Sequence, residues 1–230
     1  IPQEEVKVTP GAGPTVAAPD GARLLAVNSG IGSGKSTVAS VLEEYGIPVV
    51  SADELSRMVV APGTQGLAQV VEAFGEDILG SAGALDRGKL AEVVFSDPVK
   101  RKQLESILHP LIRERFIEVK NVLEQAGQTQ LVYEIPLLFE NKLESTVDGV
   151  IVVTASEPVR IERVIARNKL LPSEVRKRID AQIDEATRRE KADYLITNNS
   201  DQVDLRQAVE TMIRDFLQPM QLSDDDIQEL

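Results

Sequence analysis

One stretch near the N-terminus constrains the fold of this chain more than any other: Ser29-Gly30-Ile31-Gly32-Ser33-Gly34-Lys35-Ser36-Thr37. It follows an apolar run at residues 24–27 and precedes an amphipathic helical pattern. Small residues let backbone N–H groups approach phosphate oxygens closely, and the following helix points its positive dipole end at the same anion. The stretch therefore predicts a nucleoside-triphosphate-binding loop between a strand and a helix, rather than a ligand-free Gly/Ser turn.

Two side chains of this loop carry specific chemistry. Lys35 can reach the β- and γ-phosphates of ATP, and the Ser36 hydroxyl can bind the Mg²⁺ that bridges them. The backbone from Gly30 to Thr37 would surround the phosphates. The usual first glycine of such a loop is replaced by Ser29, which would cost about 1–3 kcal/mol in a left-handed conformation and almost nothing in an extended one. The sequence leaves both conformations open.

Composition narrows the class of protein. Of 230 residues, 42% are hydrophobic but only 3% aromatic, with no Trp, so the core must be aliphatic. The absence of Cys excludes disulfides, zinc–thiolate sites and thiol catalysis. A net charge of -12 argues against nucleic acid as a partner. No run is long enough to cross a membrane and no signal-peptide pattern is present, so we expect a cytoplasmic protein. The oligomeric state is not predicted.

Strand and helix patterns alternate along the chain. Five short runs rich in apolar residues are separated by segments with helical periodicity, which predicts an α/β fold. We expect a parallel five-stranded sheet flanked by helices, with the phosphate loop after its first strand. The predicted strands are residues 24–27, 47–50, 130–136, 150–154 and 194–197.

The chain divides into regions of different composition. Residues 1–22 are rich in Pro and Gly and predict a flexible arm, and residues 218–230 predict an acidic, disordered tail. Between them, 23–217 forms one domain with a helical region at about 54–126. Residues 160–191 hold ten Lys/Arg and six Asp/Glu, unlike the acidic remainder. This basic segment predicts a lid that closes on polyphosphate, with a solvated helix pair as the alternative.

Three further positions are candidates for chemistry. Asp53 follows the second strand, where ligands bind in open α/β sheets, and is either a general base or a helix N-cap. His109, the only histidine, precedes Pro110, which should kink or break its helix, and is either a site residue or structural. Glu134 or Glu140, after the third strand, could support Mg²⁺ through water.

Several stretches together resemble the dephospho-CoA kinase family. They occur in the family's order, span roughly residues 24–217, and are far more specific in combination than the phosphate loop alone. The matching stretches are Gly30–Thr37, Ala52-Asp53-Glu54-Leu55 with Arg57, Leu108-His109-Pro110-Leu111-Ile112, Ile135-Pro136-Leu137-Leu138-Phe139-Glu140, and Ala192-Asp193-Tyr194 with Asn198-Asn199.

The resemblance implies a P-loop nucleoside-triphosphate-hydrolase-like fold and an activity. The activity is ATP-dependent phosphorylation of the 3′-hydroxyl of dephospho-CoA, with Mg²⁺. It also implies residue roles: Asp53 as general base, Lys35 as phosphate ligand and Arg167 as the catalytic lid arginine. Asn198 and Asn199 would lie near the adenine of ATP, and Arg57, His109 and Pro110 would bind the acceptor.

The chain also departs from the family pattern. Asn28-Ser29-Gly30 replaces the usual Thr-Gly-Gly, Ser51-Ala52-Asp53 replaces Asp-Ala-Asp, and Thr197 and Ser200 stand where Asp and Gly are common. Because Asp53, Lys35 and Ser36 are retained, we expect an active but slower enzyme. Two alternatives remain open: a P-loop kinase with another small-molecule acceptor, and a protein that binds nucleotide without turnover.

Overall fold

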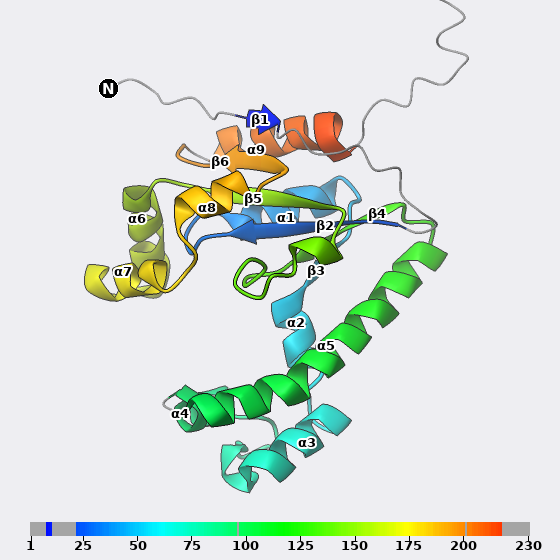
Figure 1. Cartoon of the computed structure of the whole chain (residues 1–230), viewed down its shortest axis with the longest axis vertical. Coiled ribbons are helices and arrows are strands. Elements are labelled where there is room, and N and C mark those ends of the chain that lie inside the picture. The colour runs from blue at the N-terminus through cyan, green and yellow to red at the C-terminus, as the bar shows by residue number, and fades with distance from the viewer. Residues whose placement is uncertain (1–7, 11–21, 96, 201, 218–230) are drawn as a thin grey trace, which may run out of the picture. The chain divides into compact units, whose positions relative to one another are not determined.

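The structure, a computed structural model, describes residues 8–10, 22–95, 97–200 and 202–217 (Figure 1). The chain forms two compact units, one comprising residues up to Val49 and from Thr129 onward, the other Val50–Gln128. Most of the predicted arm, residues 1–7 and 11–21, and the predicted acidic tail, 218–230, lie outside the described residues.

A single sheet organises the first unit (Figure 1). The five predicted strands are present, and β2 pairs in parallel with both β4 and β5, while β5 pairs in parallel with β6. A short sixth strand, β1, adds antiparallel to the β6 edge and was not predicted. The order is β1-β6-β5-β2-β4-β3. The bounds are β1 Val8–Pro10, β2 Arg23–Ser29, β3 Val49–Ser51, β4 Gln130–Glu134, β5 Gly149–Thr154 and β6 Tyr194–Thr197.

The strand order creates a binding position at the end of β2. The chain runs from β2 to β3 and β4 on one side of it, and then to β5 and β6 on the other side. In open parallel sheets, ligands bind beyond the carboxyl ends of the strands at the point where the direction of winding reverses. The phosphate loop leaves β2 at this point.

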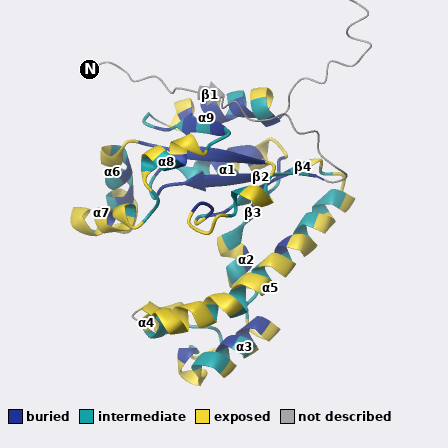
Figure 2. Cartoon of the chain, in the orientation of Figure 1, coloured by how far each residue is buried: buried dark blue, intermediate teal, exposed yellow. Residues whose placement is uncertain are grey.

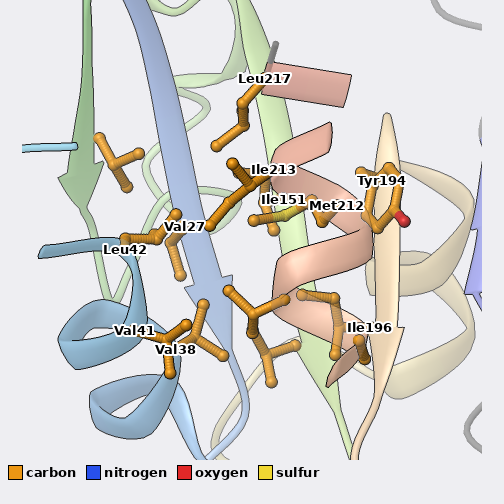
Figure 3. Close-up of a cluster of buried hydrophobic side chains, with 14 of the residues drawn as sticks. Val27, Val38, Val41, Leu42, Ile151, Tyr194, Ile196, Met212, Ile213 and Leu217 are labelled. Carbon is orange, nitrogen blue, oxygen red and sulfur yellow. The ribbon is translucent and has the colours of Figure 1, made fainter. Parts of the chain in front are cut away.

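Alternating side chains on the strands build two cores. Leu25 and Val27 of β2 pack with α1 and α9 on one face, whereas Ala26 packs with the segment after β4 on the other (Figure 3). Every residue of β5 is buried, as expected for a strand covered on both faces, and the central strands are accordingly dark in Figure 2. This rigid centre fixes the position of the loop after β2.

Helices and short turns complete the first unit. No helix within the described ranges is long and apolar enough to cross a lipid bilayer. The elements are α1 Lys35–Glu44, the 3₁₀ turn Glu144–Thr146, α6 Glu157–Asn168, α7 Pro172–Asp180, α8 Glu185–Glu190, α9 Gln202–Met212 and the π turn Ile213–Leu217.

The second unit is helical. Its core surrounds Val70 and Ile78, against which Leu104 and Leu108 of α5 pack. Asp86 accepts hydrogen bonds from the first turn of α4, and Asp97 caps α5. The elements are α2 Ala52–Met58, α3 Gln65–Phe74, a 3₁₀ turn Glu76–Ile78, α4 Arg87–Phe95 and α5 Pro98–Gln125.

Of the two outcomes expected at Pro110, a kink or a break of the helix, the break is not observed. Helix α5 is continuous through this residue, although its ribbon changes direction along its length (Figure 1). The proline removes one backbone donor and crowds the preceding turn. Packing of the apolar residues before it, including Ile107 and Leu108, and of Phe116 after it maintains the helix on both sides.

Candidate active site

The phosphate loop begins without backbone strain. Ser29 is the last residue of β2 and pairs with Val153 of β5, so it adopts the extended conformation. Among the described residues, positive φ outside glycine occurs only at Lys142 and Lys169. Ser29 is therefore extended and not left-handed, so the loop carries no strain energy at this residue.

The loop presents several unpaired backbone donors. Within the described residues, no hydrogen bond uses the N–H groups of Gly32, Gly34, Lys35 or Ser36. Gly32 and Gly34 have φ of 81° and 99°, a region that favours glycine. Four free N–H groups at the start of α1, together with its dipole, form a cradle for an anion.

Lys35 and Ser36 stand beside this cradle. The Lys35 ammonium forms an ion pair with Glu134 at the end of β4, so a charged partner holds it until phosphate arrives. The Ser36 hydroxyl is exposed and has no hydrogen-bond partner in the described part of the chain. Glu140 instead accepts a hydrogen bond from the Ile183 N–H at 3.1 Å, so Glu134 is the carboxylate placed at the loop.

This donor set fits Mg²⁺ bound with phosphates. The described residues contain no group of three or more His, Asp or Glu side chains able to hold a metal. Mg²⁺ is commonly held by one or two protein oxygens together with substrate phosphates and water. A free hydroxyl at Ser36 and a carboxylate at Glu134 match that pattern.

Two buried arginines lie against the loop, and neither was predicted from the sequence as a site residue. The Arg160 and Arg188 side chains are only 4% and 2% exposed. A Cβ added to Gly30 would lie 2.5 Å from Arg160 Nη2 and 3.1 Å from Arg188 Nη1, so both guanidinium groups lie directly against this glycine. The signal for Arg160 is its spacing, since it lies four residues before buried Val164 on the same helix face.

Residues of the predicted lid hold the backbone of Ile31 on both sides. The Ile31 N–H donates to Gln182 Oε1 at 2.9 Å, and its carbonyl accepts from Arg160 Nε at 2.9 Å. Burial lowers the pKa of Arg160, and the neighbouring Arg188 acts in the same direction, while Glu185 opposes them. The segment 160–191 is thus in direct contact with the phosphate loop.

Three asparagines connect the loop to its surroundings. Asn28 donates to the carbonyls of Ile135 and Pro136 and accepts from Arg188 Nε at 3.2 Å. Asn198 is buried and donates to the Ser33 carbonyl at 2.8 Å, and the Asn199 side chain accepts from the Ser156 N–H at 2.7 Å. The two asparagines predicted near adenine therefore also fix the loop and the segment before α6.

Arg167 occupies a different environment from the buried pair. It is exposed near the end of α6, and its hydrogen bond goes to the neighbouring Asn168 at 2.8 Å. Arg163, one turn earlier, donates to the Asn198 and Ser200 carbonyls. Exposure of the three arginines therefore increases along α6, from buried Arg160 through half-buried Arg163 to exposed Arg167.

The remaining predicted residues belong to the second unit. Asp53 and Arg57 are exposed on α2, and His109 and Pro110 are exposed on α5. The N-cap position of α2 is Ser51, and Asp53 lies inside the first turn, so the N-cap interpretation of Asp53 is wrong. Its carboxylate has no hydrogen-bond or ion-pair partner among the described residues.

The second unit also contains a pocket of about 200 Å³. Its lining is mainly aliphatic, with Ser56 and Arg87 as the polar members. Ser56 and Leu108, which line it, directly precede the predicted acceptor residues Arg57 and His109 in sequence. The sequence neighbours of Arg57 and His109, and not these two residues themselves, thus line the pocket.

Three features together define a P-loop nucleotide-binding protein: the parallel sheet with β2 at its switch point, the free N–H groups and the Lys-Ser pair.

Similarity to known proteins narrows this class to one family. The dephospho-CoA kinase family matches residues 23–204. A dephospho-CoA kinase of Listeria monocytogenes is 39% identical over 195 residues, covering 85% of this chain and 98% of the relative. One from Shouchella clausii is 44% identical over 175 residues, covering 76% and 89%. The chain belongs to the dephospho-CoA kinase family.

Solved structures agree with this assignment. The crystal structure of TT1252 from Thermus thermophilus has a TM-score of 0.74 at 34% identity and covers 86% of this chain and 99% of its own. The dephospho-CoA kinase from Campylobacter jejuni has a TM-score of 0.63 at 29% identity, covering 83% and 94%. The similarity therefore includes both units of the chain.

Proposed function

We propose that the protein transfers the terminal phosphoryl group of ATP to the 3′-hydroxyl of dephospho-CoA, giving coenzyme A and ADP. The observation that carries the proposal is an intact phosphate loop, with four free N–H groups, in a chain of this family. An unstrained Ser29 supports a functional loop and weakens the case for a binder without turnover.

On the nucleotide side, each loop residue has a distinct task. The free N–H groups bind phosphate oxygens, and Lys35 exchanges its contact with Glu134 for one with the β- and γ-phosphates. Ser36 would hold Mg²⁺, with Glu134 supporting it through water. The ion would neutralise charge on the phosphates, and the loop residues would hold the phosphates in a fixed position and orientation.

On the acceptor side, we assign Asp53 as the general base. Its carboxylate takes the proton of the 3′-hydroxyl as the oxygen attacks the γ-phosphorus. Arg57, His109 and Pro110 would contact dephospho-CoA, and the aliphatic pocket lined by Leu108 would receive an apolar part of it. The region 54–126 is thus the proposed acceptor side of the protein.

The resemblance supplies the remaining assignments. Arg167, in the proposed lid at 160–191, would add positive charge to the transition state when the acceptor is bound. Asn198 and Asn199 would lie beside the adenine while holding the loop and the α6 segment. We place the enzyme in the cytoplasm, with a small-molecule substrate and neither nucleic acid nor membrane as a partner.

An assay of the product tests the proposal. Purified protein is incubated with Mg·ATP and dephospho-CoA, ADP release is followed by a coupled assay, and the acceptor is analysed by mass spectrometry. We expect one ADP per coenzyme A formed, and no ADP above background without acceptor. ATP binding without turnover on dephospho-CoA would contradict the proposal and direct the search to other acceptors.

A further inference from the structure

We propose that Asn28 is a positioning residue that holds helix α8 of the proposed lid, residues 160–191, against the phosphate loop. Its buried amide joins this helix to the backbone that follows β4, so the protein's own contacts arrange the loop for ATP. The inference rests on the proposed use of ATP but not on the identity of the acceptor. It concerns a position at which the chain departs from the family pattern, where Asn28 stands in place of Thr.

Asn28 is a buried polar residue near the end of a central strand. It precedes Ser29 on β2, pairs with Val152 of β5, and is only 1% exposed. An amide removed from water costs free energy unless protein groups replace its hydrogen bonds. The partners of this side chain therefore indicate what the residue does.

Both ends of the Asn28 amide are hydrogen-bonded. Its Nδ2 donates to the carbonyls of Ile135 at 2.9 Å and Pro136 at 3.1 Å, and its Oδ1 accepts from Arg188 Nε at 3.2 Å. Carbonyls only accept and a guanidinium only donates, so these partners fix the orientation of the amide. One side chain in the sheet thus joins two segments that are distant in the sequence.

The first of these segments follows the carboxylate that pairs with Lys35. Glu134 ends β4, and the N–H of the next residue, Ile135, donates to the Val27 carbonyl at 3.2 Å. The Ile135 carbonyl then accepts from Asn28. Asn28 therefore fixes the backbone immediately after Glu134, whose ion pair holds Lys35 at the loop.

The second segment is α8, which carries Arg188. The Arg188 guanidinium also donates to Glu185 and to the Ile183 carbonyl, and both of these partners belong to the proposed lid. Among the described residues, the hydrogen bond to Asn28 is the one that joins Arg188 to the sheet. Without it, the hydrogen bonds that remain to this guanidinium lie within its own segment.

Contacts from the proposed lid order the loop itself. Arg188 lies against Gly30, where an added Cβ would be 3.1 Å from Nη1, and the Ile31 N–H donates to Gln182 Oε1 shortly before α8. A loop that is already ordered loses less conformational entropy when a ligand binds. Because Asn28 is buried, it would act on ATP affinity through α8 rather than by contact with the nucleotide.

Threonine is the most informative substitution at this position. Its hydroxyl supplies one donor where the amide supplies two, and its oxygen lies one bond closer to the backbone. Asn28→Thr therefore leaves at least one carbonyl without its donor and withdraws the acceptor from Arg188. Asn141→Thr is the matched control, because it makes the same change on an exposed residue of the same unit.

Two measurements without any acceptor test the proposal. Calorimetry gives the Kd of the Mg²⁺ complex of a non-hydrolysable ATP analogue. NMR of ¹⁵N-arginine-labelled protein gives the hydrogen exchange rate of the Arg188 Nε–H, whose signal is assigned by its loss in Arg188→Lys. If the arranged loop falls to about a tenth of the population in Asn28→Thr, Kd should rise about 10-fold. The Arg188 Nε–H should exchange at least about 10-fold faster, and Asn141→Thr should change neither quantity.

A purely structural role for Asn28 gives different results. It would lower Tm and the fraction of protein that binds the analogue, while the folded remainder keeps the wild-type Kd. An unchanged Kd in folded Asn28→Thr, or a weaker affinity with unchanged Arg188 exchange, would overturn the proposal.

The wild-type protein decides the matter if Asn28→Thr does not fold. An Arg188 Nε–H that Asn28 holds exchanges slowly without nucleotide, and rapid exchange would overturn the proposal. Because dephospho-CoA takes no part in these measurements, failure here is separate from failure of the proposed acceptor. Wild-type protein that does not bind the ATP analogue at all would instead contradict the proposed function.

Discussion

Asp53 lies in the first turn of α2 with an exposed carboxylate, and its backbone carbonyl accepts the Ser56 hydroxyl at 2.8 Å. Asp53→Asn leaves that backbone contact intact and removes only the base. We expect kcat to fall about 10²- to 10⁴-fold with little change in ATP affinity. Steady-state kinetics with calorimetry measure both quantities. Glu72→Gln, an exposed charge loss on α3, is the matched control, and unchanged turnover in Asp53→Asn would remove the assignment.

Gly34 tests the loop conformation at the same scale. It has φ of 99°, and an added Cβ would overlap the Asn198 amide. Gly34→Ala should therefore strain the loop by about 1–3 kcal/mol and abolish most ATP binding. Gly46→Ala is the control, because Gly46 has φ of 74° but no neighbour within 4 Å. Thermal unfolding and ATP titration measure the effects, and equal ATP affinity in the two variants would contradict the account.

Single residues were predictable where the motif is local. The loop from Gly30 to Ser36 lies between β2 and α1, where its consecutive residues predict it, and its role in phosphate binding stays a prediction. Arg160 and Arg188 were missed because they are 28 positions apart, and only the fold brings both onto Gly30. A charged residue in a basic segment ordinarily indicates a solvated face, and tertiary contacts reversed that expectation.

At the scale of elements, α5 offers a test of how a proline is tolerated. Pro110→Ala restores a backbone donor in the middle of the helix, so the free energy of unfolding should rise by up to about 3 kcal/mol. Since Pro110 is a proposed acceptor residue, KM for dephospho-CoA should rise while KM for ATP does not change.

Pro98 supplies the matched control for this measurement. It occupies the first turn of the same helix, where proline is well tolerated, so Pro98→Ala should give no comparable gain in stability. Denaturant unfolding of both variants measures the difference. A loss of stability in Pro110→Ala would show that the proline fits the helix better than alanine does.

Periodicity predicted most elements correctly. The five parallel strands follow from short apolar runs that alternate with helical patterns. The antiparallel strand β1 was missed because its three residues lie in a segment rich in Pro and Gly. Of the kink or break expected at Pro110, the break is absent, and the ribbon of the continuous helix α5 changes direction along its length (Figure 1).

For the whole molecule, ligand binding should stabilise the fold. Mg·ATP binds only the folded phosphate loop, so at about 100 times its Kd it should add roughly 2.7 kcal/mol and raise Tm. Removing Mg²⁺ with EDTA should lower this gain, and Lys35→Ala should nearly eliminate it. Thermal unfolding at several ATP concentrations measures the effect, and a Tm independent of ATP would contradict nucleotide binding.

The net charge of the chain did not predict the cationic cluster at the phosphate loop. A net charge of -12 coexists with a cationic cluster at the phosphate loop, because Lys35, Arg160 and Arg188 come from separate segments. The parallel sheet could be predicted from alternating elements. The second unit, Val50–Gln128, overlaps the helical region expected at about 54–126.

The most direct test of the central claim is the identity of the phosphorylated product. Mass spectrometry and phosphorus NMR of the acceptor, after incubation with Mg·ATP, measure whether one phosphoryl group is added and at which hydroxyl. The account predicts a single phosphate on the 3′-oxygen of dephospho-CoA, with equimolar ADP, and almost none with Asp53→Asn. An unmodified acceptor, or a phosphate at another position, would contradict it.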